Sequence, residues 1–571
     1  MEKRLILAIV LSFLVLFLYQ LIFIKPAQKP QAVQQPAQAN QPVAKEAVTP
    51  SEARTASEPL PAAKAKDEVK SFEVLEDTQE KTIKVETPLY LAEWSNRGAT
   101  LRSWKLKHHL KRLPTKDKPQ PEWLDLVPES AAKTGIYPFA LKTENQELTG
   151  RLNQALYLVR GQDLELSGTQ TGTLIFEYSD GNNIKVRKEF VFNGDEYTFK
   201  VRTTLEVDGK EIQPEVLWGP GIGTLTPEEL KQKFSANRGV AFLSQRDRKV
   251  YRLLEKKIPP ENEAQRFVGL DWAAYEENYF ASIFLFGSGS SQAFAYRVDL
   301  NEPQEDGKSA VVPYYYLSLV NPVEVYLGPK EYDRLVAYGH QTKKIINFGF
   351  FGGVAELLLV ATKFFHRYFP NWGVAIIIMT LIIKIIFFPL TYSSTKSMAR
   401  MQELQPKIKA LRAKYKKAKQ DMEQRRQMNE ELMQLYKEHG INPASGCLPL
   451  LIQLPVFWGF FRMLVVAVEF RHSPFVFWIK DLSVRDPYYV TPILMGVTQY
   501  ISQKMTPSTA DPAQQKMMLL MPFIFTIFFM NFQAGLVLYW LTNNVLQIAQ
   551  QAIMNKMMAV KREKDGKRKK K

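Results

Sequence analysis

A charged side chain interrupts an apolar stretch that is long enough to cross a bilayer. Lys384 lies inside NWGVAIIIMTLIIKIIFFPLT, which begins at Asn371. An ammonium at membrane depth costs at least ~2.5–3.5 kcal/mol, so such charges usually face water or a partner. One explanation is snorkelling of the lysine stem toward the polar residues Thr391–Ser394, roughly 12 Å away. The other is an electrostatic site in a water-filled recess, which attracts an anionic group.

Uncharged polar side chains accompany this lysine. Thr380 lies one helical turn before it, and Gln453 lies inside the next apolar stretch. Later apolar stretches carry further amides, at Gln499, Asn543, Asn544, Gln547, Gln550 and Gln551. These stretches contain no Asp or Glu, which argues against the carboxylate relay of a proton-coupled transporter. The pattern favours an uncompensated positive recess over a buried ion pair.

Residues for covalent or metal chemistry are scarce. The chain has one cysteine, Cys447, and 6 histidines. An intrachain disulfide is therefore impossible, and the sequence contains no zinc-type cluster. We expect neither enzyme activity nor a cofactor or bound metal.

The elements around Lys384 follow from shifts in composition along the 571 residues. Hydrophobic residues make up 46% while the mean hydropathy is −0.22, so the apolar residues must be clustered. The predicted segments are a signal-anchor span (1–24), a flexible Pro/Ala/Gln tether (25–70), an all-β domain (71–345), an amphipathic interfacial helix (346–370), a second span with Lys384 (371–393), a basic helical hairpin (394–442), spans three to six (443–555) and a basic tail (556–571).

The β prediction rests on alternating runs separated by turn signals. Asp180-Gly181 and Asn193-Gly194 stand between β-branched and aromatic runs and predict two hairpins. The segment is long enough for one large β-sandwich with few helices, one of them at Pro227–Phe234. No catalytic set of residues can be assigned in it, so we interpret it as a folded, non-catalytic domain outside the cytoplasm.

Charge fixes the orientation. The net charge is +17, and the hairpin and the tail both carry an excess of Lys and Arg, which places both in the cytoplasm. Six spans with both ends in the cytoplasm are consistent with this, and the β domain then lies outside. Met401, Lys407, Lys409 and Arg412 are our candidates on the hairpin for contact with an incoming chain or a ribosome. The alternative is a solvated basic face beside anionic lipid.

Five motifs resemble the YidC family of membrane protein insertases from Gram-negative bacteria. They are NWGVAIIIMTLIIKIIFFPLT, SMARMQELQPKIKALR, NPASGCLPLLIQLPVFWGFFRML, DPYYVTPILMGVTQYISQKM and GLVLYWLTNNVLQIAQQ. The order of the segments is also similar, and the resemblance covers nearly the whole chain. It implies a polytopic α-helical membrane protein with a five-helix insertase core and a large all-β periplasmic supersandwich, located in the bacterial inner membrane.

The resemblance also implies a function. Family members insert newly made membrane proteins, alone or with the Sec translocon, through a positively charged groove open to cytoplasm and bilayer. Lys384 falls where the family most often has arginine, so the charge is kept and the planar fork of the guanidinium is lost. Thr380, Gln453, Tyr539 and Trp540 are the expected groove residues. The expected partners are nascent membrane proteins, the Sec translocon, ribosomes and anionic lipids.

Two other functions stay open on the sequence. A transporter or channel with Lys384 as an anion site predicts solute flux across sealed vesicles. A membrane-anchored periplasmic chaperone predicts that removal of the β domain abolishes function.

Overall fold

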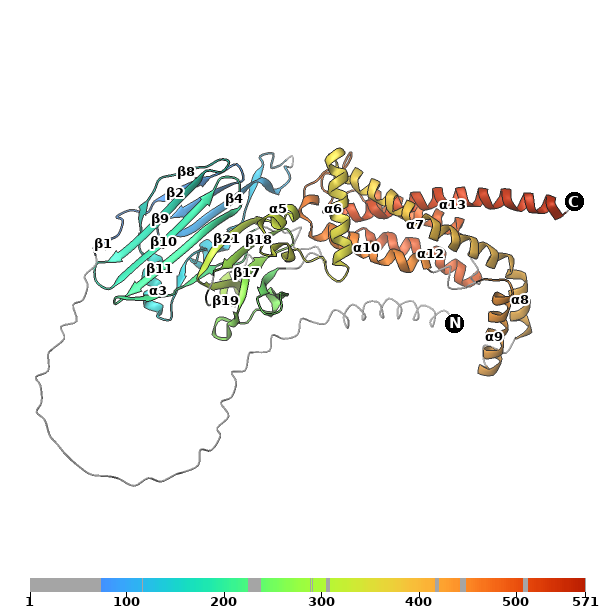
Figure 1. The fold of residues 1–571 in the computed structure, drawn as a ribbon, viewed down its shortest axis with the longest axis horizontal. Coiled ribbons are helices and arrows are strands. Elements are labelled where there is room, and N and C mark those ends of the chain that lie inside the picture. The colour runs from blue at the N-terminus through green and yellow to red at the C-terminus, as the bar shows by residue number, and fades with distance from the viewer. Residues whose placement is uncertain are drawn as a thin grey trace, which may run out of the picture.

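The computed structural model describes residues 73–114, 117–223, 238–287, 289, 291–303, 309–415, 421–441, 448–506 and 512–569. The expected anchor, the tether, the helix at Pro227–Phe234 and Cys447 lie outside the described residues. In the described part, a β domain lies beside an elongated group of helices (Figure 1).

The β domain is built on one sheet of eleven strands. Its order is β1-β9-β10-β11-β21-β18-β17-β14-β15, with β12 paired to β11 and β7 to β9. The strands are β1 (Val74–Leu75), β7 (Leu158–Arg160), β9 (Thr171–Asp180), β10 (Ile184–Asn193), β11 (Thr198–Val207), β12 (Lys210–Ile212), β14 (Gly239–Ser244), β15 (Val250–Leu254), β17 (Leu270–Glu276), β18 (Phe280–Phe286) and β21 (Pro322–Pro329). Antiparallel pairing of β9 with β10 and of β10 with β11 confirms both predicted hairpins.

Two five-stranded sheets complete the domain. One has the order β5-β4-β3-β2-β8 and the other β16-β19-β20-β13-β6. Their strands are β2 (Thr82–Glu86), β3 (Tyr90–Ser95), β4 (Thr100–Arg112), β5 (Glu122–Asp125), β6 (Leu141–Lys142), β8 (Leu164–Glu165), β13 (Glu215–Trp218), β16 (Gln265–Val268), β19 (Gln292–Pro303) and β20 (Ser309–Val320).

Aromatic side chains fill the space between these sheets. Trp94 of β3 contacts Phe190 of β10 at 4.3 Å between ring centroids, and Trp218 of β13 contacts Phe284 of β18 at 5.7 Å. Each small sheet therefore packs on a different part of the large one. This gives two sandwiches that share a sheet, which explains why alternating apolar residues continue over about 250 residues.

Short helices connect the strands. They are α2 (Ser130–Thr134), α3 (Gln146–Gln154), α5 (Tyr332–Tyr338), η1 (Glu255–Lys257), η2 (Glu261–Glu263) and η3 (Thr342–Ile345). Asn145 caps α3 by accepting hydrogen bonds from the backbone N–H groups of Glu147 and Leu148, as expected at a helix start.

A buried lysine joins the two layers of the β domain. Lys188 of β10 is 1% exposed, and its Nζ donates to the carbonyl oxygens of Gly98 (2.7 Å), Ala99 (3.2 Å) and Phe139 (2.7 Å). Burial lowers the pKa of Lys188 to about 7. The three carbonyls favour the charged form, because only an ammonium has three N–H donors.

We expect Lys188→Met to destabilise the β domain by about 3 kcal/mol or more, because it leaves three buried acceptors without a donor. Thermal unfolding followed by tryptophan fluorescence measures this change. Lys185→Met is the matched control, because Lys185 lies on the same strand and is exposed. Equal Tm values for the two variants would contradict a role for the three hydrogen bonds.

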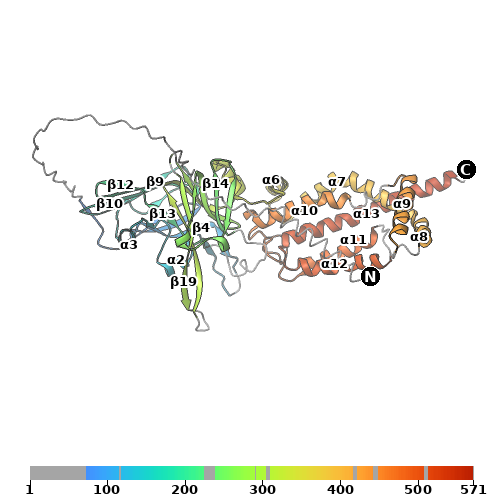
Figure 2. The same cartoon turned by 90° about the horizontal axis from the view of Figure 1, so that it is seen from below.

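The rest of the described chain is helical. Its elements are α6 (Gly352–Tyr368), α7 (Trp372–Glu403), α8 (Gln405–Lys414), α9 (Met422–Glu438), α10 (Leu448–Val466), η5 (Val468–Phe470), α11 (Val490–Met505), α12 (Pro512–Phe529) and α13 (Ala534–Lys569). α7 continues past the predicted end of the second span at residue 393, and α13 continues from the predicted last span into the basic tail. Helices α7 and α10–α13 run lengthwise beside one another, and α8 and α9 lie at the end remote from the β domain (Figures 1 and 2).

One helix in the described residues, Trp372–Glu403, is long and apolar enough to cross a membrane. Ile452–Val466 and Lys516–Phe529 are shorter apolar helices. α6 presents an exposed apolar stripe at Leu357, Val360, Phe364 and Tyr368 while its opposite face is buried. The interfacial position of this helix stays a prediction.

Ion pairs and hydrogen bonds join the β domain to the helices. The Arg471 guanidinium, in the segment that follows η5, donates to the carbonyl oxygen of Leu110 in β4 at 2.8 Å. Lys363 of α6 lies 2.8 Å from Asp333 of α5 and 3.1 Å from Glu469 of η5. The β domain is therefore held on one end of the helices by groups from both α5 and β4.

Candidate functional site

Lys384 lies where α7 packs against α13. α7 has a long apolar run. Asn371 caps its first turn, because its side chain accepts from the backbone N–H of Val374 at 3.1 Å. Lys384 is half-buried, and its Nζ donates to Oε1 of Gln547 on α13 at 2.8 Å. The lysine thus points toward the neighbouring helix rather than along its own helix toward Thr391–Ser394.

Three polar side chains form a stripe on the facing side of α13. Tyr539, Asn543 and Gln547 are spaced four residues apart, so they share one helix face. Nε2 of Gln453 on α10 donates to Oδ1 of Asn543 at 2.9 Å. Gln453 and Lys384 therefore contact the same face of α13, about one helical turn apart.

A second polar stripe on α13 faces α11. Trp540 Nε1 donates to Oε1 of Gln499 at 3.1 Å, and Nδ2 of Asn544 donates to the carbonyl oxygen of Met495 at 3.2 Å. Because amides are costly to bury without partners, these pairs allow four helices to share polar side chains in an apolar surrounding. We call Lys384, Gln453, Gln499, Asn543, Asn544 and Gln547 the polar cluster.

The other expected groove residues take different places. Thr380 is 1% exposed, and its hydroxyl donates to the carbonyl oxygen of Ile376 at 2.7 Å. Tyr539 is 1% exposed and stacks on Phe460 at 4.3 Å between centroids, whereas Trp540 is half-buried. Thr380 and Tyr539 are therefore buried in the helix packing, and Trp540 contacts the cluster through Gln499.

The charge of Lys384 is not neutralised by a carboxylate. Among the described residues it has no ion-pair partner, and the amide of Gln547 is its hydrogen-bond acceptor. A cation held by a neutral dipole keeps most of its field for an approaching anion.

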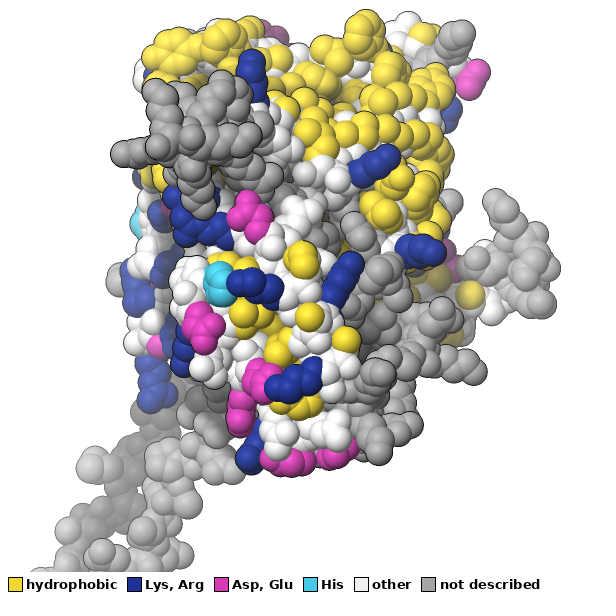
Figure 3. Space-filling model, turned by 90° about the vertical axis from the view of Figure 1, so that its right-hand side faces the viewer, with side chains coloured by type: hydrophobic (Ala, Val, Ile, Leu, Met, Phe, Trp, Pro, Cys, Tyr) yellow, Lys and Arg dark blue, Asp and Glu magenta, His cyan; other side chains and the backbone are white. Residues whose placement is uncertain are grey.

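The helical hairpin has a small core of its own. Met401 is 6% exposed and packs with Leu404, Ile408 and Tyr436, so it lies inside the hairpin. The other three candidate contact residues are exposed on α8: Lys407, Lys409 and Arg412. Figure 3 views this end of the molecule and shows Lys and Arg side chains spread over it with fewer Asp and Glu among them.

At the opposite end of the helices, the segment between α10 and α11 bonds to the start of α13. Leu482 is fully buried, and its carbonyl oxygen accepts from the backbone N–H of Gly535 at 2.9 Å. The carbonyl oxygen of Val484 accepts from the N–H of Ala534 at 2.7 Å. These bonds satisfy the first N–H groups of α13 and hold the segment against the start of that helix.

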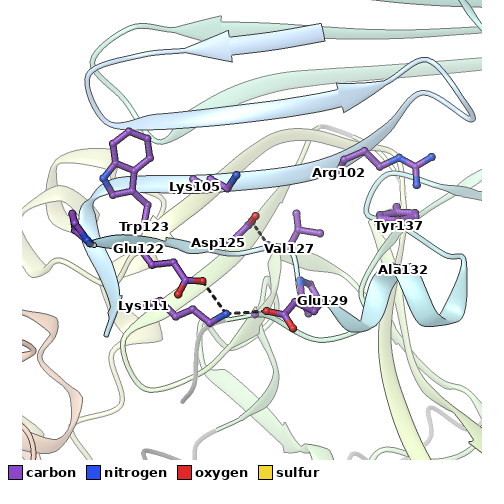
Figure 4. Close-up of a pocket in the computed structure, with 13 residues that line it drawn as sticks. Arg102, Lys105, Lys111, Glu122, Trp123, Asp125, Val127, Glu129, Ala132 and Tyr137 are labelled. Atoms are coloured by element: carbon purple, nitrogen blue, oxygen red, sulfur yellow. Dashed lines mark hydrogen bonds and ion pairs between the residues drawn. The ribbon is translucent and has the colours of Figure 1, made fainter. Parts of the chain in front are cut away.

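A cavity of about 570 Å³ lies in the β domain, away from the polar cluster (Figure 4). Four of the charged side chains that line it bond to neighbouring residues. Lys111 lies 3.2 Å from Glu122 and 2.9 Å from Glu129, and Asp125 accepts from the Ser103 hydroxyl at 2.6 Å. Burial raises the pKa of Asp125. We therefore place the candidate site at the polar cluster.

Comparison with known proteins assigns the family. A family model described as 60Kd inner membrane protein matches residues 364–562, and one described as YidC periplasmic domain matches residues 82–361. A membrane protein insertase YidC from Geotalea uraniireducens is 36% identical over 576 residues, which cover 98% of this chain and 100% of the relative. The chain belongs to the YidC family of membrane protein insertases.

The chain is also similar to other YidC proteins. The membrane protein insertase YidC of Citrifermentans bemidjiense is 38% identical over 486 residues, covering 84% of this chain and 86% of the relative. A solved structure of an active YidC insertase is 19% identical, covers 84% of this chain and 94% of that chain, and has a TM-score of 0.35. The model that matches residues 364–562 is described as an inner membrane protein, and the one that matches residues 82–361 as a periplasmic domain. These descriptions agree with the expected places of the two parts of the chain.

Proposed function

We propose that this chain is a membrane protein insertase that moves short polar segments of new membrane proteins across the inner membrane, using a hydrophilic groove lined by the polar cluster. The single observation that carries this proposal is Lys384, a half-buried ammonium that is bonded to a neutral amide and has no carboxylate partner among the described residues. The proposed groove opens to the cytoplasm and to the bilayer.

The proposal includes six spans with both chain ends in the cytoplasm. The first span is the segment 1–24, and the others are α7 and α10–α13, five helices that form the insertase core. The excess of Lys and Arg on the hairpin and on the tail supports this orientation. The hydrogen bonds between the α10–α11 segment and the start of α13 support a groove that is closed on the periplasmic side.

The mechanism follows from electrostatics and desolvation. A polar, often acidic tail of the substrate enters from the cytoplasmic side and is attracted by Lys384. The amides of the cluster replace part of its hydration, which lowers the cost of leaving water. The apolar segment of the substrate moves along the lipid-facing side of the core into the bilayer. Burial of that segment, with the membrane potential, then drives the tail outward. No covalent step is needed.

The hairpin and the tail are the proposed entry surface. Exposed Lys407, Lys409 and Arg412 suit an incoming acidic segment or a ribosome, and Met401 supports them from the hairpin core. The tail reaches farther into the cytoplasm because it continues α13 as far as Lys569. Anionic lipids are further partners for this basic surface, and cooperation with the Sec translocon is part of the proposal from the family resemblance.

The function is tested by reconstitution in sealed vesicles. A small Sec-independent membrane protein with an acidic tail is synthesised beside vesicles that contain this chain, and the protease-protected fraction of the tail is measured. We expect protection that depends on the chain, without leakage of small anions when substrate is absent. Anion flux without substrate, together with unprotected tails, would instead support a channel.

Removal of residues 71–330 separates insertion from a periplasmic chaperone function. Because Asp333 and Asn347 are retained, the shortened chain keeps the ion pair to Lys363 and the hydrogen bond from Arg462. We therefore expect most of the insertion activity to remain in the same protease-protection assay. Complete loss, with the shortened chain present in the vesicles at normal amounts, would place the activity in the β domain.

A further inference from the structure

The amide nitrogen of Gln547 is the feature of the polar cluster on which this inference rests. Its Oε1 accepts from Lys384 Nζ at 2.8 Å, and within the described part of the chain no hydrogen bond is made by its Nε2. Asn543, one turn away on the same face, is already bonded to Gln453. Gln547 is therefore the amide next to the ammonium that is available to a substrate.

A carboxamide can change which of its atoms faces the lysine. Its oxygen accepts and its nitrogen donates, and both sit on one planar group whose terminal torsion is soft and roughly two-fold. When a carboxylate reaches Lys384, the oxygen of Gln547 repels it while the nitrogen attracts it. A rotation of the Gln547 amide by half a turn breaks its hydrogen bond with Lys384. It then presents Nε2 to the substrate carboxylate, as a second donor beside the ammonium of Lys384.

We infer that Lys384 and Gln547 together form a two-donor clamp for one carboxylate of the substrate tail. The inference rests on the proposed insertase function and deepens it by assigning Gln547 a direct part in binding the acidic group of the tail. Two N–H donors side by side, one from each residue, reproduce the parallel pair that a single guanidinium offers to a carboxylate. The clamp thus restores the fork that lysine at position 384 lacks, and it selects Asp and Glu side chains over polar neutral ones.

The clamp predicts a dependence between the two positions. In the chain with Lys384, Gln547→Leu removes the second donor, and we expect about tenfold slower insertion of an acidic-tailed substrate, the effect of about one charge-assisted hydrogen bond. In the chain with Lys384→Arg, the guanidinium carries both donors. There we expect Gln547→Leu to change the rate by less than about twofold, since nothing remains for the amide to supply.

A cycle of four chains tests this: the original chain, Lys384→Arg, Gln547→Leu and the double variant. Insertion into vesicles is measured for a substrate with Asp in its tail and for the same substrate with Asn, and the amount and Tm of each variant are compared. Gln547→Met takes the place of Gln547→Leu if the leucine variant does not accumulate. Gln453→Leu is the matched control, because its partner is Asn543 and arginine at position 384 should not rescue it.

The outcomes separate the clamp from the insertase proposal. Slower insertion of the Asp substrate by Gln547→Leu with Lys384, and its rescue by Lys384→Arg, supports the clamp. An equal loss in both backgrounds, or no loss in either, overturns it. If Lys384→Glu, measured beside the four chains, still slows insertion in those cases, the proposed function stands without the clamp. If neither residue affects either substrate, the proposed role of the polar cluster fails as well.

Discussion

Lys384→Glu should slow insertion of an acidic-tailed substrate by about 100-fold, which corresponds to about 2.7 kcal/mol and is the size expected for one charge at membrane depth. Reversal of the charge replaces attraction of the tail by repulsion, and the half-buried position of Lys384 weakens screening by water and salt. The rate at which the tail becomes protected from protease measures the effect.

Three further variants at the same position separate charge from shape. Lys384→Arg should insert at a rate near that of the original chain, because it keeps the positive charge. Lys384→Ala should fall between arginine and glutamate. Lys384→Met keeps the apolar stem and should resemble alanine. Equal rates for methionine and lysine would mean that the side chain serves packing, and that its charge has no part in insertion.

Gly496→Val should prevent close packing of α11 against α12. A Cβ atom at Gly496 would lie 1.9 Å from Oγ1 of Thr526, far inside contact distance. Small residues at such positions let membrane helices approach, and overpacking commonly costs about 1–3 kcal/mol or more. We expect a lower Tm in detergent and slower insertion. The slower insertion is expected because α11 carries Gln499 of the polar cluster and also Met495, whose carbonyl oxygen accepts from Asn544.

A control and a rescue identify the cause of this loss. Gly353→Val introduces the same residue into α6, where a Cβ meets no atom within 4 Å, so it should leave the Tm nearly unchanged. Thr526→Ala should recover part of the stability of Gly496→Ala, because it removes the oxygen that the new methyl group meets. A failure of Thr526→Ala to improve Gly496→Ala would show that another contact limits the approach of the two helices.

Much of the polar cluster could be predicted from the sequence because buried amides and charges are rare in apolar stretches. Lys384, Gln453 and Asn543 stand out for that reason, and the structure brings them to one face of α13. The specific partner of Lys384 could not be predicted, since Gln547 was one of seven candidate amides. Which amide meets the lysine depends on the rotation and axial shift of α13 relative to α7, and helix packing sets both.

In the β domain, too, the local elements could be predicted from the sequence and the long-range arrangement could not. Turn residues such as Asn193-Gly194 predicted hairpins because they permit the required turns. The sequence did not reveal that two small sheets share one large sheet, because that depends on long-range contacts such as Trp94 with Phe190. The role of Lys188 was also missed, because a lysine in an alternating strand is usually interpreted as exposed.

The position of the substrate tail during insertion tests the central claim most directly. In a chain with Cys447→Ser, single cysteines replace Asn543, in the polar cluster, or Val545, which is 49% exposed on another face of α13. A substrate with one cysteine in its acidic tail is arrested during insertion, and disulfide formation is measured. The account predicts a crosslink at position 543 and little at position 545, with the crosslink lost in Lys384→Glu. Equal crosslinking at both positions, or a crosslink unaffected by Lys384→Glu, would contradict it.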